Sequence, residues 1–270
     1  MKIIYHEDYL TDYFTSLAEN PIRVSIIHNK LKEFYETLRP EPASKENLLL
    51  VHSREHLEKV QQEGKETYQT ALLAAGGALR AARLAYLGEP SFAIIRPPGH
   101  HAGNARYGGF CFFNNIAVAV ADLLQAGQIQ TAVILDIDMH RGDGTQSIFS
   151  QSSCVSVIDV WARERDVYLR NLQDELDRIS QTDIIAVSAG FDLYVEDWGG
   201  LLETSDFQHI GHIIHKAAVE KAHGRYFSLL EGGYFLNDLG KNVLAFCQGL
   251  DGTLPGQAPF KAGRSPRLAC

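Results

Sequence analysis

The fold is constrained most strongly by short, continuously apolar runs that alternate along the chain with helix-like patterns. In Ala132–Leu135 and in Ile184–Val187 every side chain is apolar. Runs of this kind are typical of strands buried on both faces of a parallel sheet. We predict seven strands: Ile3–Tyr5, Asn47–Val51, Phe92–Ile95, Thr131–Asp136, Cys154–Val160, Ile184–Ser188 and Tyr226–Leu230.

Helix-like patterns fill the intervals between these runs. Asn20-Pro21 is a good helix start, because asparagine caps a helix and proline suits its first turn. Four further helices are predicted at Thr70–Leu87, Asn115–Ala126, Asp166–Ile179 and Asp206–His223, the last capped by Ser205. Because strands and helices alternate without a low-complexity linker, we predict a single domain over residues 1–270, an open α/β/α sandwich with a mostly parallel sheet.

Composition limits the partners of such a domain. The chain has 270 residues, 45% of them hydrophobic, and a formal net charge of −8. An acidic chain without a basic cluster is a poor nucleic-acid binder, and no apolar run has the length that spans a bilayer. The four cysteines (Cys111, Cys154, Cys247 and Cys270) include no CxxC pair. They predict free thiols in a reducing compartment, so we expect a cytoplasmic protein that binds neither nucleic acid nor membrane.

Two carboxylates and an imidazole follow the run Thr131–Leu135 at alternate positions, as Asp136, Asp138 and His140. Alternate side chains of an extended segment share a face, so all three can point at one place. Burying two carboxylates together is costly unless a cation neutralises them, and oxygen and nitrogen ligands suit zinc or iron(II). Asp143 can reach back as a hydrogen-bond acceptor. The alternative interpretation is a turn that caps a helix.

Three other predicted strands also end in chemically useful residues. Asp192 follows the strand Ile184–Ser188 and would complete three protein ligands, the number typical of a catalytic zinc site. His100 and His101 lie on a proline-stiffened loop, and imidazole suits acid–base work near neutral pH. Tyr234 follows two glycines and carries a phenolic donor. Taken singly, these residues also fit a helix cap, a solvated histidine pair and a core tyrosine.

Taken together and in this order, the segments resemble the histone deacetylase family, which includes acetylpolyamine amidohydrolases. The matching stretches are RPPGHHAG (Arg96–Gly103), GGFCFFNNIAVA (Gly108–Ala119), LDIDMHRGDGTQ (Leu135–Gln146), SAGFD (Ser188–Asp192) and LEGGY (Leu230–Tyr234), with Asp197-Trp198-Gly199-Gly200 as a further familiar flank. The sequence of the first stretch, RPPGHHAG, is more similar to the class II and bacterial branch than to class I. The resemblance implies the arginase–deacetylase fold, in agreement with the predicted sandwich.

The resemblance also implies a role for each site residue. The zinc ligands, with iron(II) as the alternative metal, are Asp138, His140 and Asp192. The acid–base group is His101, with His100 as its electrostatic partner, Asp136 and Asp143 as the carboxylates behind them, and Tyr234 as donor to the substrate carbonyl. The walls of an acyl-lysine tunnel are Gly109 and Phe110. A structural potassium ion is implied at Asp136, Asp138 and His140, with Ser156 nearby.

The activity implied is zinc-dependent hydrolysis of an N-acyl amide, with acylated lysine as the first substrate and an acetylated polyamine or small-molecule amide as the alternative. Two hypotheses come from other classes. A catalytically inactive reader of acyl-lysine would not need the histidine pair and Tyr234. A ureohydrolase of the arginase type would need two metals, and the motifs provide ligands for one. The substrate and the oligomeric state stay open.

The chain departs from the family pattern in three places. Arg141 stands where many members have a second histidine. The stretch Val60–Thr67 has no aspartate where several lysine deacetylases use one to hold the substrate backbone, and its acidic residues are Glu63 and Glu66. The stretch Asp159–Asp183 is short where relatives carry a glycine-rich segment that helps to wall the site. We therefore expect an altered rim.

Overall fold

A computed structural model describes residues 1–253, whose strands form one seven-stranded, wholly parallel sheet. The strands are β1 (Lys2–Ile4), β2 (Glu36–Leu38), β3 (Ser91–Ala93), β4 (Ala132–Asp136), β5 (Val155–Asp159), β6 (Ile184–Ala189) and β7 (Tyr226–Leu230). Their order across the sheet is β2-β1-β3-β7-β6-β4-β5. This open α/β/α arrangement confirms the predicted fold class.

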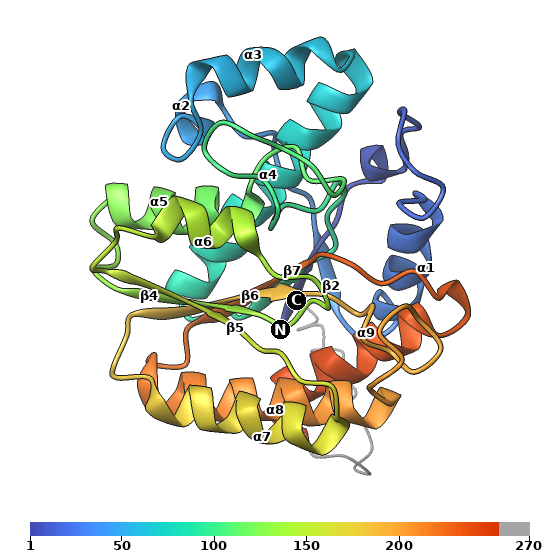
Figure 1. The fold of residues 1–270 in the computed structure, drawn as a ribbon, viewed down its shortest axis with the longest axis vertical. Coiled ribbons are helices and arrows are strands. Elements are labelled where there is room, and N and C mark those ends of the chain that lie inside the picture. The colour runs from blue at the N-terminus through green and yellow to red at the C-terminus, as the bar shows by residue number, and fades with distance from the viewer. Residues whose placement is uncertain (254–270) are drawn as a thin grey trace, which may run out of the picture.

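Helices cover both faces of the sheet (Figure 1). They are α1 (Ile22–Leu31), α2 (Lys45–Leu48), α3 (Arg54–Gln62), α4 (Lys65–Tyr86), α5 (Asn115–Gln125), α6 (Asp143–Phe149), α7 (Arg165–Arg178), α8 (Thr204–Lys221) and α9 (Leu236–Leu250), with a 3-10 turn at Glu7–Leu10. In Figure 1, α5 and α6 lie on one face, and α7 and α8 on the other. Within residues 1–253, no helix is long and apolar enough to cross a bilayer.

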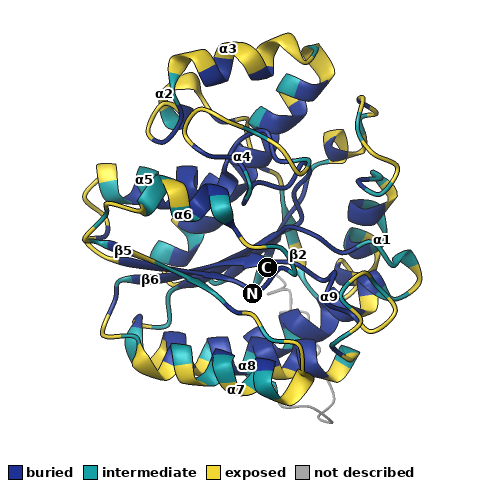
Figure 2. Cartoon of the chain, in the orientation of Figure 1, coloured by how far each residue is buried: buried dark blue, intermediate teal, exposed yellow. Residues whose placement is uncertain are grey.

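The strands in the middle of the sheet explain the apolar runs of the sequence. β3, β4, β6 and β7 are buried along their whole length, whereas the edge strand β5 has only Val155 buried. Figure 2 shows the same pattern, with dark strands inside and exposed residues on the outer helix faces. Burial on both faces of a strand favours apolar side chains, which removes the regular polar alternation of a half-exposed strand.

Six of the seven predicted strands are confirmed, and Asn47–Val51 is wrong. That segment enters α2, which Ser44 begins as a cap by accepting a hydrogen bond from the backbone of Asn47. Of its three leucines only Leu48 is buried, so the run does not have the two-sided burial of a central strand. Local capping thus overrides the apolar pattern here.

The predicted helices lie within a few residues of their expected bounds, but the cap of α8 is wrong. Glu203, not Ser205, precedes α8, and its capping box with Asp206 satisfies the backbone at this end. The strand β2 and the helices α2, α3, α6 and α9 were not predicted. Cys111, Cys154 and Cys247 are free thiols as expected, and Cys270 lies outside the described residues.

Candidate active site

Four neighbouring strands bring the polar segments of the sequence together. β3, β7, β6 and β4 lie side by side in that order, and all run in parallel. Their carboxyl ends therefore meet at one edge of the sheet, where ligands of open α/β sheets bind. The segments that follow them carry the histidine pair, Tyr234, Asp192 and the Asp136–His140 motif. The strand order therefore brings together residues that lie more than a hundred positions apart in the sequence, such as His100 and Tyr234.

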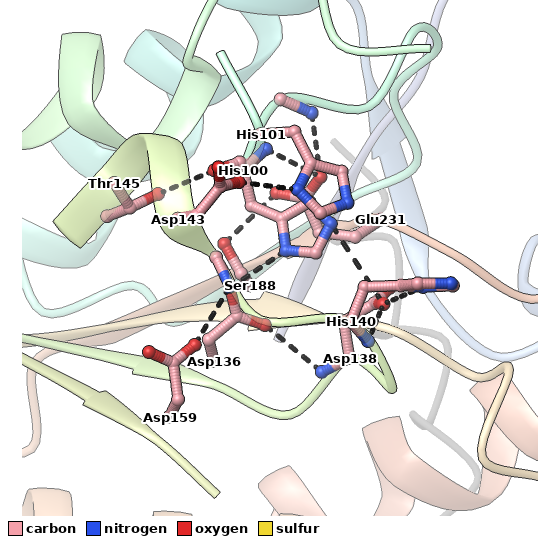
Figure 3. A network of polar contacts seen from close by, with 12 residues as sticks. His100, His101, Asp136, Asp138, His140, Asp143, Thr145, Asp159, Ser188 and Glu231 are labelled. Carbon is pink, nitrogen blue, oxygen red and sulfur yellow. Dashed lines mark hydrogen bonds and ion pairs between the residues drawn. The ribbon is translucent and has the colours of Figure 1, made fainter. Parts of the chain in front are cut away.

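His100 is held rigidly at this edge (Figure 3). Its Nδ1 lies 2.9 Å from Oδ2 of Asp136, and its backbone N–H donates to Oε2 of Glu231 at 3.2 Å. Burial lowers the pKa of His100, but the charges of Asp136, Asp138 and Glu231 outweigh it and hold this pKa well above its ordinary value. His100 is therefore suited to stay positively charged beside the reacting atoms.

His101 has a second carboxylate behind it. Its Nδ1 lies 2.8 Å from Oδ1 of Asp143, whose Oδ2 accepts a hydrogen bond from Arg106 at 2.6 Å. Burial and the neighbouring charge of His100 hold the pKa of His101 below its ordinary value. Gly109 has φ +55° and lies against the His101 ring, and a Cβ at this position would be 3.1 Å from its Cγ. The imidazole is thus kept neutral and tightly placed, as a proton acceptor requires.

Asp138, His140 and Asp192 form a compact cluster. Nδ1 of His140 lies 3.0 Å from both Oδ1 of Asp138 and Oδ2 of Asp192. Oδ2 of Asp138 accepts a hydrogen bond from the backbone of Gly232 at 2.8 Å, and Oδ1 of Asp192 accepts one from the backbone of Met139 at 3.0 Å. One ligand atom from each of the three residues lies within 4.8 Å of the others.

The charges of this cluster fit a bound cation. Oδ2 of Asp192 is buried and makes no well-aligned hydrogen bond among the described residues, and its ion-pair contact is Nδ1 of His140, which Oδ1 of Asp138 shares. Burial and the charge of Asp138 raise the pKa of Asp192 to about 7, and the two carboxylates raise the pKa of His140 to about 10. Two buried carboxylates thus compete for the positive charge of one imidazole. A divalent metal would satisfy all three groups, and this nitrogen and oxygen set suits zinc or iron(II).

A second group of potential ligands consists of His100, Cys111 and Glu231. Its members are already engaged in the core. Oε2 of Glu231 accepts hydrogen bonds from Gly99 and His100, and Oε1 accepts one from Ser188 at 3.0 Å. This group is therefore a hydrogen-bonded support for the histidine loop, and the two-metal arrangement of a ureohydrolase has no second open ligand set among the described residues.

Tyr234 is held from three sides. The Trp198 indole stacks on its ring with centroids 4.0 Å apart, the Arg23 guanidinium lies 4.8 Å from its centroid, and Phe110 approaches edge-on at 6.5 Å. Oδ2 of Asp197 accepts hydrogen bonds from the backbones of Tyr234 and the next residue at 2.6 and 2.8 Å. Burial raises the pKa of Tyr234 above its ordinary value, so its hydroxyl remains a proton donor.

Ser156 does not lie beside Asp136, where the potassium site was expected, because of the register between β4 and β5. Asp136 pairs with Asp159, whereas Ser156 pairs with Val133 three residues earlier and is exposed. The side chain at the end of β5 is Asp159, which accepts a hydrogen bond from the backbone of Gly142 at 2.9 Å. A one-dimensional motif match cannot set this register, because it depends on the pairing of two strands.

The residues at the three departures from the expected motif pattern, Glu63, Glu66, Trp161 and Arg141, are all exposed. Glu63 accepts a hydrogen bond from the hydroxyl of Tyr107, whereas Glu66 lines a separate cavity with Arg39. Residues 160–164 alone join β5 to α7, which leaves Trp161 64% exposed. Arg141 contacts the side chain of Gln146 and takes no part in the cluster.

Three positioning residues were not predicted. Arg23 is buried and donates hydrogen bonds to the backbone carbonyls of Glu231 and Gly233, both at 2.6 Å. Glu231 supports the histidine loop, and Asp197 holds the Tyr234 backbone. Glu231 and Asp197 lie within stretches that resemble the family, so the sequence could have indicated a role for them. Arg23 follows a helix start without any motif, so only the fold reveals it.

Comparison with known proteins finds similar sequences over most of the chain. Residues 17–174 match the family model described as "Histone deacetylase domain". A protein of Methanothermobacter thermautotrophicus named "Probable deacetylase" is 30% identical over 80% of this chain and 79% of its own length. Human "Polyamine deacetylase HDAC10" is 28% identical over 99% of this chain, and Saccharomyces cerevisiae "Histone deacetylase HDA1" 25% over 96%. The match spans 50% and 48% of those two proteins, respectively.

A solved structure gives the same fold. The crystal structure titled "Crystal Structure of HDA15 HD domain" superposes with a TM-score of 0.80, covering 94% of this chain and 91% of that one at 24% identity. At this identity the likeness establishes the architecture alone.

Proposed function

Because this chain belongs to the histone deacetylase family, we propose that it is a metal-dependent deacylase that hydrolyses N-acyl amides in a single catalytic domain. Acylated lysine is the first candidate substrate. The observation that carries the proposal is the cluster of Asp138, His140 and Asp192 beside two histidines, each backed by its own carboxylate. This combination supports hydrolysis more than binding alone, because a reader of acyl-lysine needs no acid–base pair.

The metal would be held by Asp138, His140 and Asp192, which are buried or half-buried. When bound, it supplies Lewis-acid polarisation of water and of the amide carbonyl. Zinc is the first candidate and iron(II) the second, on the grounds of the ligand atoms. A structural potassium ion near Asp136 stays a proposal as well, without Ser156.

His101 is assigned the proton transfers. Its Nδ1 is bonded to Asp143, and its Nε2 has no hydrogen-bond partner among residues 1–253. The neutral ring can therefore take a proton from the attacking water at Nε2 and later give it to the leaving amine. Water thus adds across the amide bond, releasing a carboxylate and a free amine. The lowered pKa of His101 favours the form that starts this sequence.

Tyr234 and His100 are assigned the stabilisation of developing negative charge. The raised pKa of Tyr234 keeps its hydroxyl protonated, so it can donate to the carbonyl oxygen as that oxygen becomes an oxyanion. The charge on His100 is maintained by Asp136. Donors held in place before reaction need no reorganisation, and Trp198, Arg23 and Asp197 provide this restraint for Tyr234.

The test is acetate release by the purified, zinc-loaded chain from an acetyl-lysine peptide and from N-acetylputrescine. We expect activity that a chelator removes and added zinc restores. His101→Ala should lose activity while keeping its metal, and His209→Ala, at an exposed position on α8, should behave as the parent. Acetyl-lysine binding by the metal-loaded chain without acetate release would identify a reader instead.

A further inference from the structure

A cavity of about 270 Å³ opens beside the proposed metal ligands. Its lining includes Asp138, Met139, Trp161, Arg163, Tyr168 and Trp198. It lies at the connection between β5 and α7, which consists of residues 160–164. The cavity is therefore a concave, partly aromatic space next to the proposed catalytic residues.

Trp198 joins this cavity to the proposed reaction centre. One indole stacks on Tyr234 at 4.0 Å and meets His140 edge-on, with ring centroids 6.1 Å apart. The same side chain lines the cavity and is 54% exposed. A substrate with its amide at the histidine pair can thus extend along Trp198 into the cavity.

The charges around the cavity favour a negative group. Its only charged lining residues are Asp138, a buried member of the metal cluster, and Arg163, which is exposed. Arg163 lies 5.7 Å from the Trp161 ring centroid and has no ion pair within residues 1–253. By contrast, Arg106 and Arg165 are paired with Asp143 and Asp206.

The other lining residues add no second exposed charge. Tyr168 lines the cavity, but it is buried and its hydroxyl has no hydrogen-bond partner among the described residues. The lining therefore presents the exposed guanidinium of Arg163 together with two indoles. No carboxylate is free to receive an ammonium group there, because Asp138 is directed at Gly232 and His140.

We propose that this cavity is a substrate subsite that binds a carboxylate on the amine side of the scissile amide, with Arg163 as its specificity-determining residue. The inference rests on the proposed deacylase function. The indoles of Trp161 and Trp198 pack against the aliphatic stem of the substrate, and the guanidinium pairs with the carboxylate. A protonated polyamine tail would meet Arg163 instead and be repelled. The carboxylate comes either from a free acetylated amino acid or from an acidic residue beside acetyl-lysine in a peptide.

Intrinsic fluorescence reports on this subsite directly, because the chain has two tryptophans and both line the cavity. The probes are Nα,Nε-diacetyl-lysine, its neutral carboxamide and N-acetylputrescine, mixed rapidly with the zinc-loaded chain and read before turnover. We expect the carboxylate to bind about fivefold more tightly than the carboxamide, the upper range for an exposed ion pair, and N-acetylputrescine to bind weakest.

Arg163→Gln should reduce that ratio to about one. The matched control is Arg170→Gln, which removes an exposed arginine of α7 outside the cavity and should keep the ratio. Both variants keep the catalytic residues. An unchanged ratio in Arg163→Gln, or tightest binding of N-acetylputrescine, would overturn the subsite.

A second arm compares kcat/KM for capped acetyl-lysine peptides that carry Glu or Gln beside the acetylated residue. A preference for Glu that Arg163→Gln removes identifies the peptide as the source of the carboxylate. A preference confined to diacetyl-lysine identifies the free amino acid. Charge-selective binding without any acetate release would leave the subsite standing while the deacylase function fails. Turnover without an Arg163-dependent charge preference would support the deacylase function and overturn the subsite.

Discussion

At the scale of single residues, Asp192 is the strongest test of the metal cluster. Its buried Oδ2 lies 3.0 Å from Nδ1 of His140, and Oδ1 of Asp138 lies at the same distance from that nitrogen. Asp192→Ala removes one of three ligands, so bound metal and acetate release should be lost together. Elemental analysis beside the activity assay measures both. Asp174→Ala, at an exposed position of α7, should keep both. Full metal occupancy in Asp192→Ala would mean that the ligands are misassigned.

Tyr234 tests the assignment of the oxyanion donor. Tyr234→Phe keeps the ring that packs against Trp198 and Arg23, so fold and metal content should be retained. Loss of one such donor costs about 2–4 kcal/mol of transition-state stabilisation, which lowers kcat by roughly 30- to 1,000-fold. Steady-state kinetics with matched metal content measure this. Near-parental kcat would assign the donation to another group.

At the scale of elements, His52 connects the segments that carry the site. Its Nδ1 lies 2.9 Å from the carbonyl oxygen of Gly103, and its Nε2 accepts a hydrogen bond from the backbone of Asn114 at 2.9 Å. Asn114 caps α5 and also donates to the carbonyl of Ala102 at 2.8 Å. The neutral ring with a proton on Nδ1 satisfies both partners. Protonating Nε2 would break the bond from Asn114.

This arrangement predicts a pH dependence of stability. Burial and the charge of neighbouring His56 lower the pKa of His52 from 6.5 to about 3. The unfolded chain therefore binds a proton between about pH 6.5 and 3 that the folded chain excludes, and stability falls as pH falls through this window. At pH 5 the loss amounts to about 2 kcal/mol from this group.

Denaturant unfolding at pH 7.5 and pH 5 measures this loss. His52→Gln should be less stable than the parent at pH 7.5, because it weakens two hydrogen bonds, but should lose less stability on acidification. His209→Gln, at an exposed position, should keep the parental pH dependence. The same slope in His52→Gln and parent would place the titrating group elsewhere.

At the scale of the whole molecule, the β5–α7 connection bears on how open the site is. It consists of residues 160–164, and Trp161 within it is exposed. Selectivity needs walls and placed polar groups. We therefore expect kcat/KM to vary by less than about a hundredfold, or about 2.7 kcal/mol, across acetyl-lysine peptides with varied flanks. A steeper preference for one flanking sequence would show that the rim is complete, for example through an oligomer interface.

Much of the fold can be predicted from local sequence patterns, and the errors of that prediction have local causes. The central strands were predictable because burial on both faces favours nearly continuous apolar runs. The strand predicted at Asn47–Val51 is wrong because a short capped helix can also contain an apolar run. β2 was missed because its three residues, Glu36–Leu38, are at most half-buried and carry no such pattern.

The sequence by itself determined which residues carry the proposed chemistry. The types, spacing and order of the histidines, aspartates and Tyr234 predict a metal site with acid–base groups. Only the tertiary structure decided their mutual placement. Strand order puts β7 and β6 between β3 and β4, and the β4–β5 register moves Ser156 away from Asp136. The tertiary structure also brings Arg23 to Tyr234 and forms the cavity that Arg163 lines. These contacts join residues far apart in the chain, and their energies depend on packing that no local pattern contains.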